Sequence, residues 1–125
     1  MAKKVALIDD SRVMRSILRK AIMMSEMGIE DIVEAENGKV GLEMIKSNYD
    51  SLDLIFTDLD MPEMTGVEMM RHLKADGLSK VPIVIVSTVG DNQMRQTCRE
   101  LGAVDYINKP FSHEDIVQFI QTFWK

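Results

Sequence analysis

The sequence has few of the residues that cross-link or interrupt a chain: one cysteine, three prolines and seven glycines in 125 residues. The single cysteine, Cys98, excludes an internal disulfide framework and a cysteine-based zinc site, and it fits a reducing cytosol. Cys98 lies on an apolar stripe, so we expect a core residue rather than a redox sensor. No apolar run approaches the ~18 residues of a membrane span, and no signal peptide precedes the first strand-like segment. We therefore expect a soluble, cytoplasmic protein that makes no membrane contact.

Basic residues are outnumbered, with 15 Lys and Arg against 20 Asp and Glu and a net charge of −5. Nucleic-acid binding depends on neutralising phosphates, so this balance argues against direct DNA binding, although it does not exclude a local basic patch. Aromatic residues are few, whereas there are 11 methionines. Those on apolar stripes are expected to fill the core. Met23, Met24 and Met27 cluster near the end of the first predicted helix, and the sequence leaves open whether they form a packing seam or a contact surface.

The length corresponds to one domain that can bury a normal core without disulfides or metals. No linker, internal repeat or low-complexity stretch is visible, which also argues against disorder. The last predicted helix ends at Trp124–Lys125. We therefore expect a single domain over residues 1–125, with no effector domain.

Short apolar runs alternate with segments of helical period. Three runs are continuously apolar, as is typical of strands buried on both faces of a parallel sheet; they are Val5–Ile8, Leu54–Phe56 and Ile83–Val86. Two weaker runs, Ile32–Ala35 and Val104–Ile107, are predicted to be outer strands.

Between these strands lie five segments whose apolar residues recur near the i, i+3, i+4 and i+7 spacing of a helix face. Their apolar stripes begin at Met14, Gly41, Gly66, Met94 and Ile116. Strict alternation of strand and helix predicts an α/β fold, in which a parallel sheet with right-handed crossovers carries helices on both faces.

Polar residues follow the predicted strands, at the edge of an open α/β sheet where ligands bind. Asp9–Asp10 follow the first strand, Asp58 and Asp60 the third, Ser87 ends the fourth, and Lys109 follows the fifth. Each has an ordinary interpretation alone, since Asp-Asp-Ser runs are usually turns with a helix cap and a lysine before proline is usually a solvated loop residue. Their coincidence at four strand ends favours one shared site.

Carboxylates that lie close together cannot all stay ionised at low cost, so either a pKa rises or a cation binds. Hard carboxylate oxygens suit Mg²⁺ or Mn²⁺ rather than zinc. A magnesium ion that keeps several waters leaves room for a substrate phosphate, to which Lys109 and Ser87 can offer charge and a hydroxyl donor. Asp58 is the candidate nucleophile for aspartyl-phosphate chemistry, because it ends a central strand flanked by the others.

Four segments, in order and at matching spacing, together resemble the receiver domain of bacterial two-component response regulators: Ile8–Ser11, Phe56–Pro62 followed by Thr65–Gly66, Val86–Ser87 and Asn108–Phe111. The resemblance covers essentially the whole chain, which in layout is similar to stand-alone, chemotaxis-type members. It implies a flavodoxin-like, doubly wound (βα)5 fold with a parallel five-stranded sheet in the order 2-1-3-4-5.

The resemblance also implies roles for the site residues. Asp58 would accept a phosphoryl group from a sensor-kinase phosphohistidine or from a small donor such as acetyl phosphate. The side chains of Asp10 and Asp58 and the backbone carbonyl of Asp60 would bind Mg²⁺, with Asp9 acting largely through water. Lys109 would bridge to the phosphoryl group, and would pair with a carboxylate when that group is absent.

The same resemblance implies a switch. Ser87 would move to the phosphoryl group and the ring of Tyr106 would then turn inward, changing the face formed by the fourth helix, fifth strand and fifth helix. A downstream effector or motor-switch protein, as in chemotaxis or motility, would bind that face. A phosphatase is a further expected partner, and the protein is expected to be a monomer rather than a stable oligomer. The Lys109–Pro110 peptide bond is expected to be cis. Without the resemblance, Tyr106 would be interpreted as an outer-strand aromatic that half-covers the sheet.

Several positions stay ambiguous. Thr88 stands where many family members have alanine and would narrow access to the phosphoryl group, while Asp60 and Val89 lie at variable positions that modulate dephosphorylation. His72 and His113 lie on predicted helix surfaces without metal-like spacing and are interpreted as solvated.

Three alternatives carry different functions. Asp58-Leu59-Asp60 is similar to the nucleophile motif of haloacid-dehalogenase-type phosphatases, but that family needs a longer chain and leaves Asp9–Asp10 without a role. A flavodoxin-like FMN carrier shares the fold, but the acidic first loop, Asp9–Arg12, lacks the hydroxyl- and glycine-rich character that would hold a flavin phosphate. A receiver that acts without phosphorylation is disfavoured by the intact acidic set. The expected protein is therefore no enzyme beyond its own phosphorylation and dephosphorylation.

Overall fold

The computed structural model describes residues 3–88 and 90–124. Strands and helices alternate strictly through these residues, which confirms the predicted α/β class. The elements are β1 (Lys3–Ile8), α1 (Arg12–Met24), β2 (Ile29–Ala35), α2 (Gly38–Asn48), β3 (Leu54–Thr57), α3 (Gly66–Ala75), β4 (Ile83–Ser87), α4 (Asn92–Glu100), β5 (Ala103–Asn108) and α5 (His113–Phe123).

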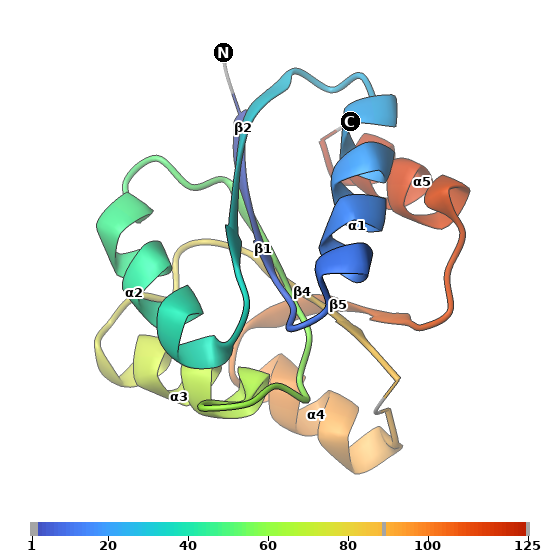
Figure 1. The fold of residues 1–125 in the computed structure, drawn as a ribbon. Helices are drawn as coiled ribbons and strands as arrows, with labels where there is room; N and C mark the ends of the chain where they lie inside the picture. Colours follow the sequence, from blue (N-terminus) through green and yellow to red (C-terminus); the bar gives the residue numbers. More distant parts are fainter. Residues whose placement is uncertain (1–2, 89, 125) are drawn as a thin grey trace.

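The strands of the described residues form a parallel five-stranded sheet in the order β2-β1-β3-β4-β5, as predicted. Helices α1 and α5 cover one face, and α2, α3 and α4 cover the other (Figure 1). The chain winds to one side from β1 to β2 and then returns to the other side of β1 as β3. This reversal places the switch point of the topology at the carboxyl ends of β1 and β3, which is where doubly wound sheets bind ligands.

The central strands β1, β3 and β4 are almost wholly buried, which explains their continuously apolar sequences. The edge strands were harder to delimit from sequence. Strand β2 begins at Ile29 rather than at the predicted Ile32, because an edge strand can expose Glu30 and Asp31 to solvent without losing its pairing with β1. Periodicity therefore identified both outer strands but placed the start of β2 too late.

The predicted helix stripes face the sheet. Met69 and Met70 of α3 are fully buried, as expected for methionines that fill the core. Met23 and Met24, in contrast, are 57% and 51% exposed near the end of α1, so these two do not form a packing seam. Among the described residues, no helix is both long and apolar enough to cross a membrane.

Candidate functional site

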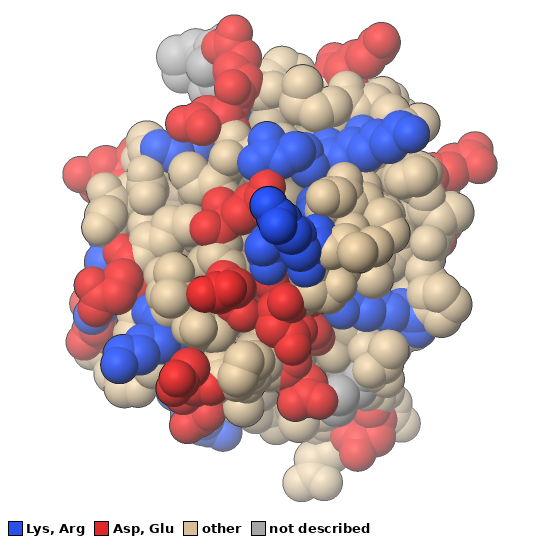
Figure 2. Space-filling view, viewed as in Figure 1, with Lys and Arg blue, Asp and Glu red and all other residues tan. Residues whose placement is uncertain are grey.

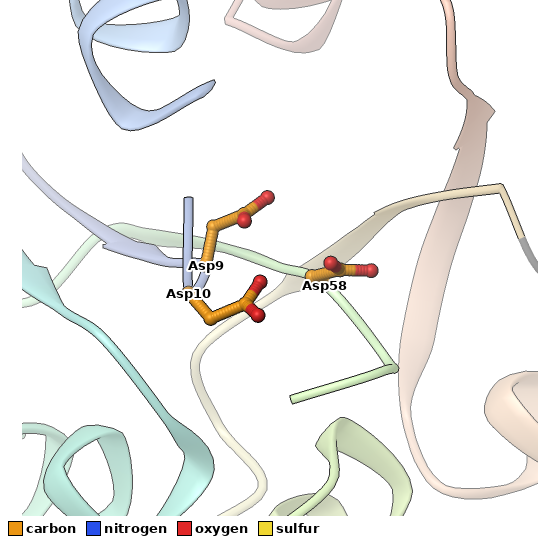
Figure 3. Close-up of side chains that lie close together, drawn as sticks. All are labelled: Asp9, Asp10 and Asp58. Carbon is orange, nitrogen blue, oxygen red and sulfur yellow. The ribbon is translucent and has the colours of Figure 1, made fainter. Parts of the chain in front are cut away.

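The sheet topology brings the acidic residues together at the carboxyl ends of β1 and β3. Asp9 and Asp10 directly follow β1, and Asp58 directly follows β3. Figure 3 shows the three side chains leaving these two neighbouring strand ends. One carboxylate oxygen from each residue lies within 4.8 Å of the others, so the three form a compact group that can hold a cation.

Backbone hydrogen bonds hold the residues of the site in place just beyond the regular strands. The N–H groups of three site residues donate to carbonyls of adjacent strands: Asp9 to Ala35 (3.1 Å), Asp58 to Ile8 (2.9 Å) and Lys109 to Ser87 (3.1 Å). Because the sheet ladder continues to the site residues themselves, the positions of their side chains are set by the rigid sheet rather than by a loop.

Lys109 joins the two buried carboxylates. Its ammonium nitrogen lies 2.9 Å from Oδ2 of Asp9 and 3.2 Å from Oδ2 of Asp58. The other oxygens accept backbone hydrogen bonds, from Ser11 N–H to Asp9 (2.9 Å) and from Leu59 N–H to Asp58 (2.7 Å). Asp9 and Asp58 are 1% and 7% exposed, so each buried carboxylate is paired and oriented.

The electrostatics of the site favour binding of a further cation. Burial raises the pKa of Asp9, and its hydrogen bonds from Lys109 and Ser11 only partly oppose that rise. Burial alone would lower the pKa of Lys109, but the hydrogen bond and charge of Asp9 and the charge of Asp58 raise it, which keeps the ammonium protonated. Three carboxylates against one ammonium leave a formal excess of negative charge, and acidic and basic side chains adjoin at the middle of the face in Figure 2.

The donor set fits magnesium. It consists of hard carboxylate oxygens, and Asp10 is exposed with no hydrogen bond or ion pair among the described residues, so its oxygens are available to an ion. Asp10 and Asp58 would supply the nearest side-chain ligands. Both carboxylate oxygens of Asp9 already accept hydrogen bonds, one from Lys109 and one from a backbone N–H, so Asp9 is suited to contact the ion through a water molecule.

Other predicted site residues lie around this group. Ser87 ends β4 and is fully buried, while Thr88 beside it is exposed. The side chain of Asp60 is exposed and lines a groove of about 480 Å³ between the β3–α3 loop, α3 and α4; it is not part of the acidic group. Val89 lies outside the described residues.

The two remaining predicted site residues, Tyr106 and Lys109, lie in β5 and directly after it. Tyr106 lies in β5 opposite Ile85 of β4, with its ring half-buried against the core. Lys109 follows the strand, and the peptide bond between Lys109 and Pro110 is cis.

Sequence reasoning missed an ion-pair network that supports Asp9. The guanidinium of Arg15 in α1 donates to the backbone carbonyl of Asp9 (2.6 Å) and to Glu34 of β2 (2.9 Å). Arg19, one turn later, donates to the same carboxylate at 2.6 and 2.8 Å. The spacing of the two arginines by four residues placed them on one helix face, but only the pairing of β1 with β2 brings Glu34 opposite them.

The two histidines differ. His72 is exposed, as predicted. The prediction that His113 is solvated is wrong: the residue is half-buried, and its Nε2 has almost no accessible surface and no hydrogen-bond partner within the described residues. It is the first residue of α5, next to the N-cap Ser112, and not a residue in the middle of the exposed helix face.

Comparison with known proteins identifies the family. Residues 5–121 match the family model of the response regulator receiver domain, so the chain belongs to that family. It is 37% identical over 110 residues to the chemotaxis protein CheY1 of Helicobacter pylori J99, covering 87% of this chain and 86% of the relative. It is 33% identical over 110 residues to a chemotaxis protein CheY homolog of Campylobacter jejuni, covering 87% and 82%.

Solved structures agree on the fold. The CheX–CheY–BeF3–Mg complex from Borrelia burgdorferi includes a chain that superposes with a TM-score of 0.87 at 22% identity, covering 98% of this chain and 90% of that one. The chemotaxis protein CheY4 of Vibrio cholerae superposes with a TM-score of 0.84 at 24% identity, covering 98% of each chain. These similarities establish a CheY-like receiver fold.

Proposed function

We propose that this protein is a phosphoacceptor switch of a two-component phosphorelay, in which Asp58 takes a phosphoryl group from the phosphohistidine of a sensor kinase. The observation that carries the proposal is the ammonium of Lys109, which bridges the buried carboxylates of Asp9 and Asp58 beside the open carboxylate of Asp10. This arrangement gives one nucleophile, one cation for the transferred group and a set of ligands for a metal.

The transfer step follows from these positions. A carboxylate oxygen of Asp58 attacks phosphorus, the phosphorus–nitrogen bond of the donor breaks, and the imidazole nitrogen keeps the bonding pair and takes a proton. Lys109 lies where it can exchange its contact with the Asp58 carboxylate for the transferred oxygens. Mg²⁺ bound by Asp10, Asp58 and the carbonyl of Asp60 would compensate charge on the phosphoryl oxygens.

Relay to a partner starts at Ser87. Its hydroxyl comes from the end of β4, next to β3 and the acceptor, and would move toward the phosphoryl oxygens. Tyr106 on β5 would transmit this change to the surface formed by α4, β5 and α5, which is the proposed output face.

The partners are proposed from the relatives. CheY relatives are chemotaxis proteins by name, and one solved relative is in complex with CheX. We infer a histidine kinase as donor, an effector or motor-switch protein on the output face, and a phosphatase. That the protein is cytoplasmic and monomeric, and catalyses only its own phosphorylation and dephosphorylation, stays a prediction.

The hydrolase alternative is disfavoured by the position of Asp60. A haloacid-dehalogenase-type mechanism needs the second aspartate of Asp58-Leu59-Asp60 beside the nucleophile, whereas the acidic group contains Asp9 and Asp10 instead. Stoichiometric labelling of Asp58 without turnover of a phosphate ester would distinguish the switch from the hydrolase.

The test is incubation with acetyl phosphate and Mg²⁺, followed by intact mass measurement. The wild type should gain one phosphoryl group, Asp58→Asn should gain none, and the exposed-acid control Asp50→Asn should behave as the wild type. Asp10→Ala should weaken Mg²⁺ binding measured by calorimetry. No mass gain in the wild type, under conditions that label another receiver, would refute the phosphoacceptor assignment, and an unchanged Mg²⁺ affinity of Asp10→Ala would refute the metal assignment.

A further inference from the structure

The hydroxyl of Tyr106 is buried near Ser87. Its oxygen has almost no accessible surface, and the Ser87 side chain lies close enough to interact with it. Burial raises the pKa of Tyr106. Contacts of the ring also hold Tyr106 in this position, against the core and against α4.

Arg95 of α4 makes the most specific of these contacts. Its guanidinium carbon lies 4.3 Å from the centroid of the Tyr106 ring, which is a cation–π arrangement. The same guanidinium donates from Nη2 to Oδ1 of Asn108 (2.7 Å) and from Nε to the carbonyl of Gly90 (3.3 Å). Two nitrogens of the Arg95 guanidinium are thus hydrogen-bonded while the group lies over the ring.

The loop before α4 packs closely against one side of the ring, whereas the side toward α5 borders a groove of about 450 Å³. A Cβ atom on Gly90 would lie 3.4 Å from Cε1 of Tyr106 and 3.3 Å from Oδ1 of Asn108, so the β4–α4 loop packs directly against this cluster. Turning the ring away from Arg95 would break the cation–π contact, while the hydrogen bonds to Asn108 and Gly90 keep the guanidinium in place. A lysine could not replace these contacts, because only the planar guanidinium donates in two directions while it stacks.

We propose that Arg95 is a positioning residue of the switch: it latches Tyr106 inward across the α4–β5 interface while Lys109 is still paired with Asp9 and Asp58. The α4–β5 surface would then be largely set before phosphoryl transfer, which would strengthen rather than create the output conformation. The proposal depends on the proposed function only for the role of Tyr106 in signalling; the latch itself is a property of the ring and of Arg95.

The ring position can be measured without any phosphodonor or Mg²⁺. The chain has two tyrosines, Tyr49 and Tyr106. Incorporation of 3-fluorotyrosine gives one ¹⁹F resonance for each, and Tyr106→Phe assigns them. The change in ¹⁹F shift from H₂O to D₂O reports solvent exposure of the ring. In wild type, the Tyr106 signal should be well shielded relative to free 3-fluorotyrosine, and in Arg95→Met the ratio of outward to inward rings should rise by about two- to fivefold or more.

Matched variants separate the latch from general effects. Arg99→Met, one turn along α4, should leave Tyr106 unchanged, because Arg99 donates to Gln96 and, within the described residues, makes no cation–π contact with the ring. Asn108→Ala should give an intermediate exposure, since it removes one anchor of the guanidinium. An unchanged Tyr49 resonance reports an intact fold. Wild-type exposure equal to that of the free amino acid, or an Arg95→Met signal identical to wild type, would overturn the latch, whereas a failure of Asp58 labelling would overturn only the proposed function.

Discussion

The ammonium nitrogen of Lys109 lies 3.2 Å from Oδ2 of Asp58, although 51 positions separate the two residues in the chain. Asp58 follows β3 and Lys109 follows β5, so β4 lies between their strands. The pair is 13% and 9% exposed at its side chains, and Asp9 shares the same ammonium. Lys109 is therefore the charge that allows two carboxylates to be buried side by side.

Removal of that charge should be costly. In Lys109→Met, the carboxylates of Asp9 and Asp58 stay buried without their cation, and we expect the free energy of unfolding to fall by about 3–5 kcal/mol in EDTA. Mg²⁺ should restore more stability to the variant than to the wild type, because the ion replaces the missing positive charge. Urea unfolding with and without Mg²⁺ measures both effects.

The control for this variant is Lys46→Met, which removes an ion pair with Asp76 whose side chains are 44% and 47% exposed. Such a surface pair contributes ~0.5 kcal/mol or less. Equal losses in the two variants would contradict the assignment of Lys109 as the compensating charge of a buried site.

Gly66 fixes the position of the acceptor backbone. It is the first residue of α3, and a Cβ there would overlap the carbonyl oxygen of Asp58 and lie 3.0 Å from Cα of Leu59. Gly66→Ala should therefore lower stability by about 1–3 kcal/mol and slow labelling of Asp58 by acetyl phosphate, because the backbone around the nucleophile must shift. Intact mass against time, together with thermal unfolding, measures the two effects.

Gly41→Ala provides the comparison in another buried helix. Its Cβ would meet only side-chain atoms, of Ile8 at 3.0 Å and Met69 at 3.1 Å, and these can move. The helix propensity of alanine offsets part of the crowding by ~1 kcal/mol. We expect a small stability change and wild-type labelling; a labelling defect as large as that of Gly66→Ala would contradict the specific role of Gly66.

Glu34 should give the stability a defined pH dependence. Burial alone would raise its pKa, but hydrogen bonds and charges from Arg19 and Arg15 hold the pKa below its usual value of 4.5. A carboxyl group with a lower pKa in the folded state stabilises the fold above its unfolded pKa, and this contribution is lost as the pH falls through the folded pKa. Glu34→Gln should therefore be less stable than wild type at neutral pH, and the difference should shrink on acidification below pH ~4.5.

Unfolding by urea between pH 3 and 7 tests this prediction. Glu30→Gln serves as the control, since Glu30 is exposed on the same strand and makes no ion pair within the described residues. A pH-independent difference between wild type and Glu34→Gln would show that the arginine network does not act through the charge of this carboxyl group.

Part of this protein could be predicted from local sequence. Strands buried on both faces must be continuously apolar, so the sequence alone predicts strands at Val5–Ile8 and Ile83–Val86. Parallel strands end at one edge of their sheet, so the residues that follow them lie at that edge. Asp9, Asp58 and Lys109 were therefore expected together before any geometry was known, and the structure brings them together.

Other features could not be predicted, because they depend on which residues the fold places opposite each other. Glu34 lies opposite Arg15 only through the pairing of β1 with β2, and the burial of Nε2 of His113 depends on which parts of the fold surround the start of α5. No periodicity carries this information, since these contacts join segments whose relative position is set by the whole sheet.

The sequence by itself determined the alternation of strands and helices, the acidic residues at the carboxyl edge of the sheet and the lysine that follows the last strand. Each of these features depends only on local residue pattern and on the order of the strands. Only the tertiary structure decided that Lys109 joins Asp9 to Asp58 and that Arg95 covers the ring of Tyr106. The physical reason is that ion pairs and ring contacts act over a few ångströms, and only close packing of separate elements fixes which side chains come that near.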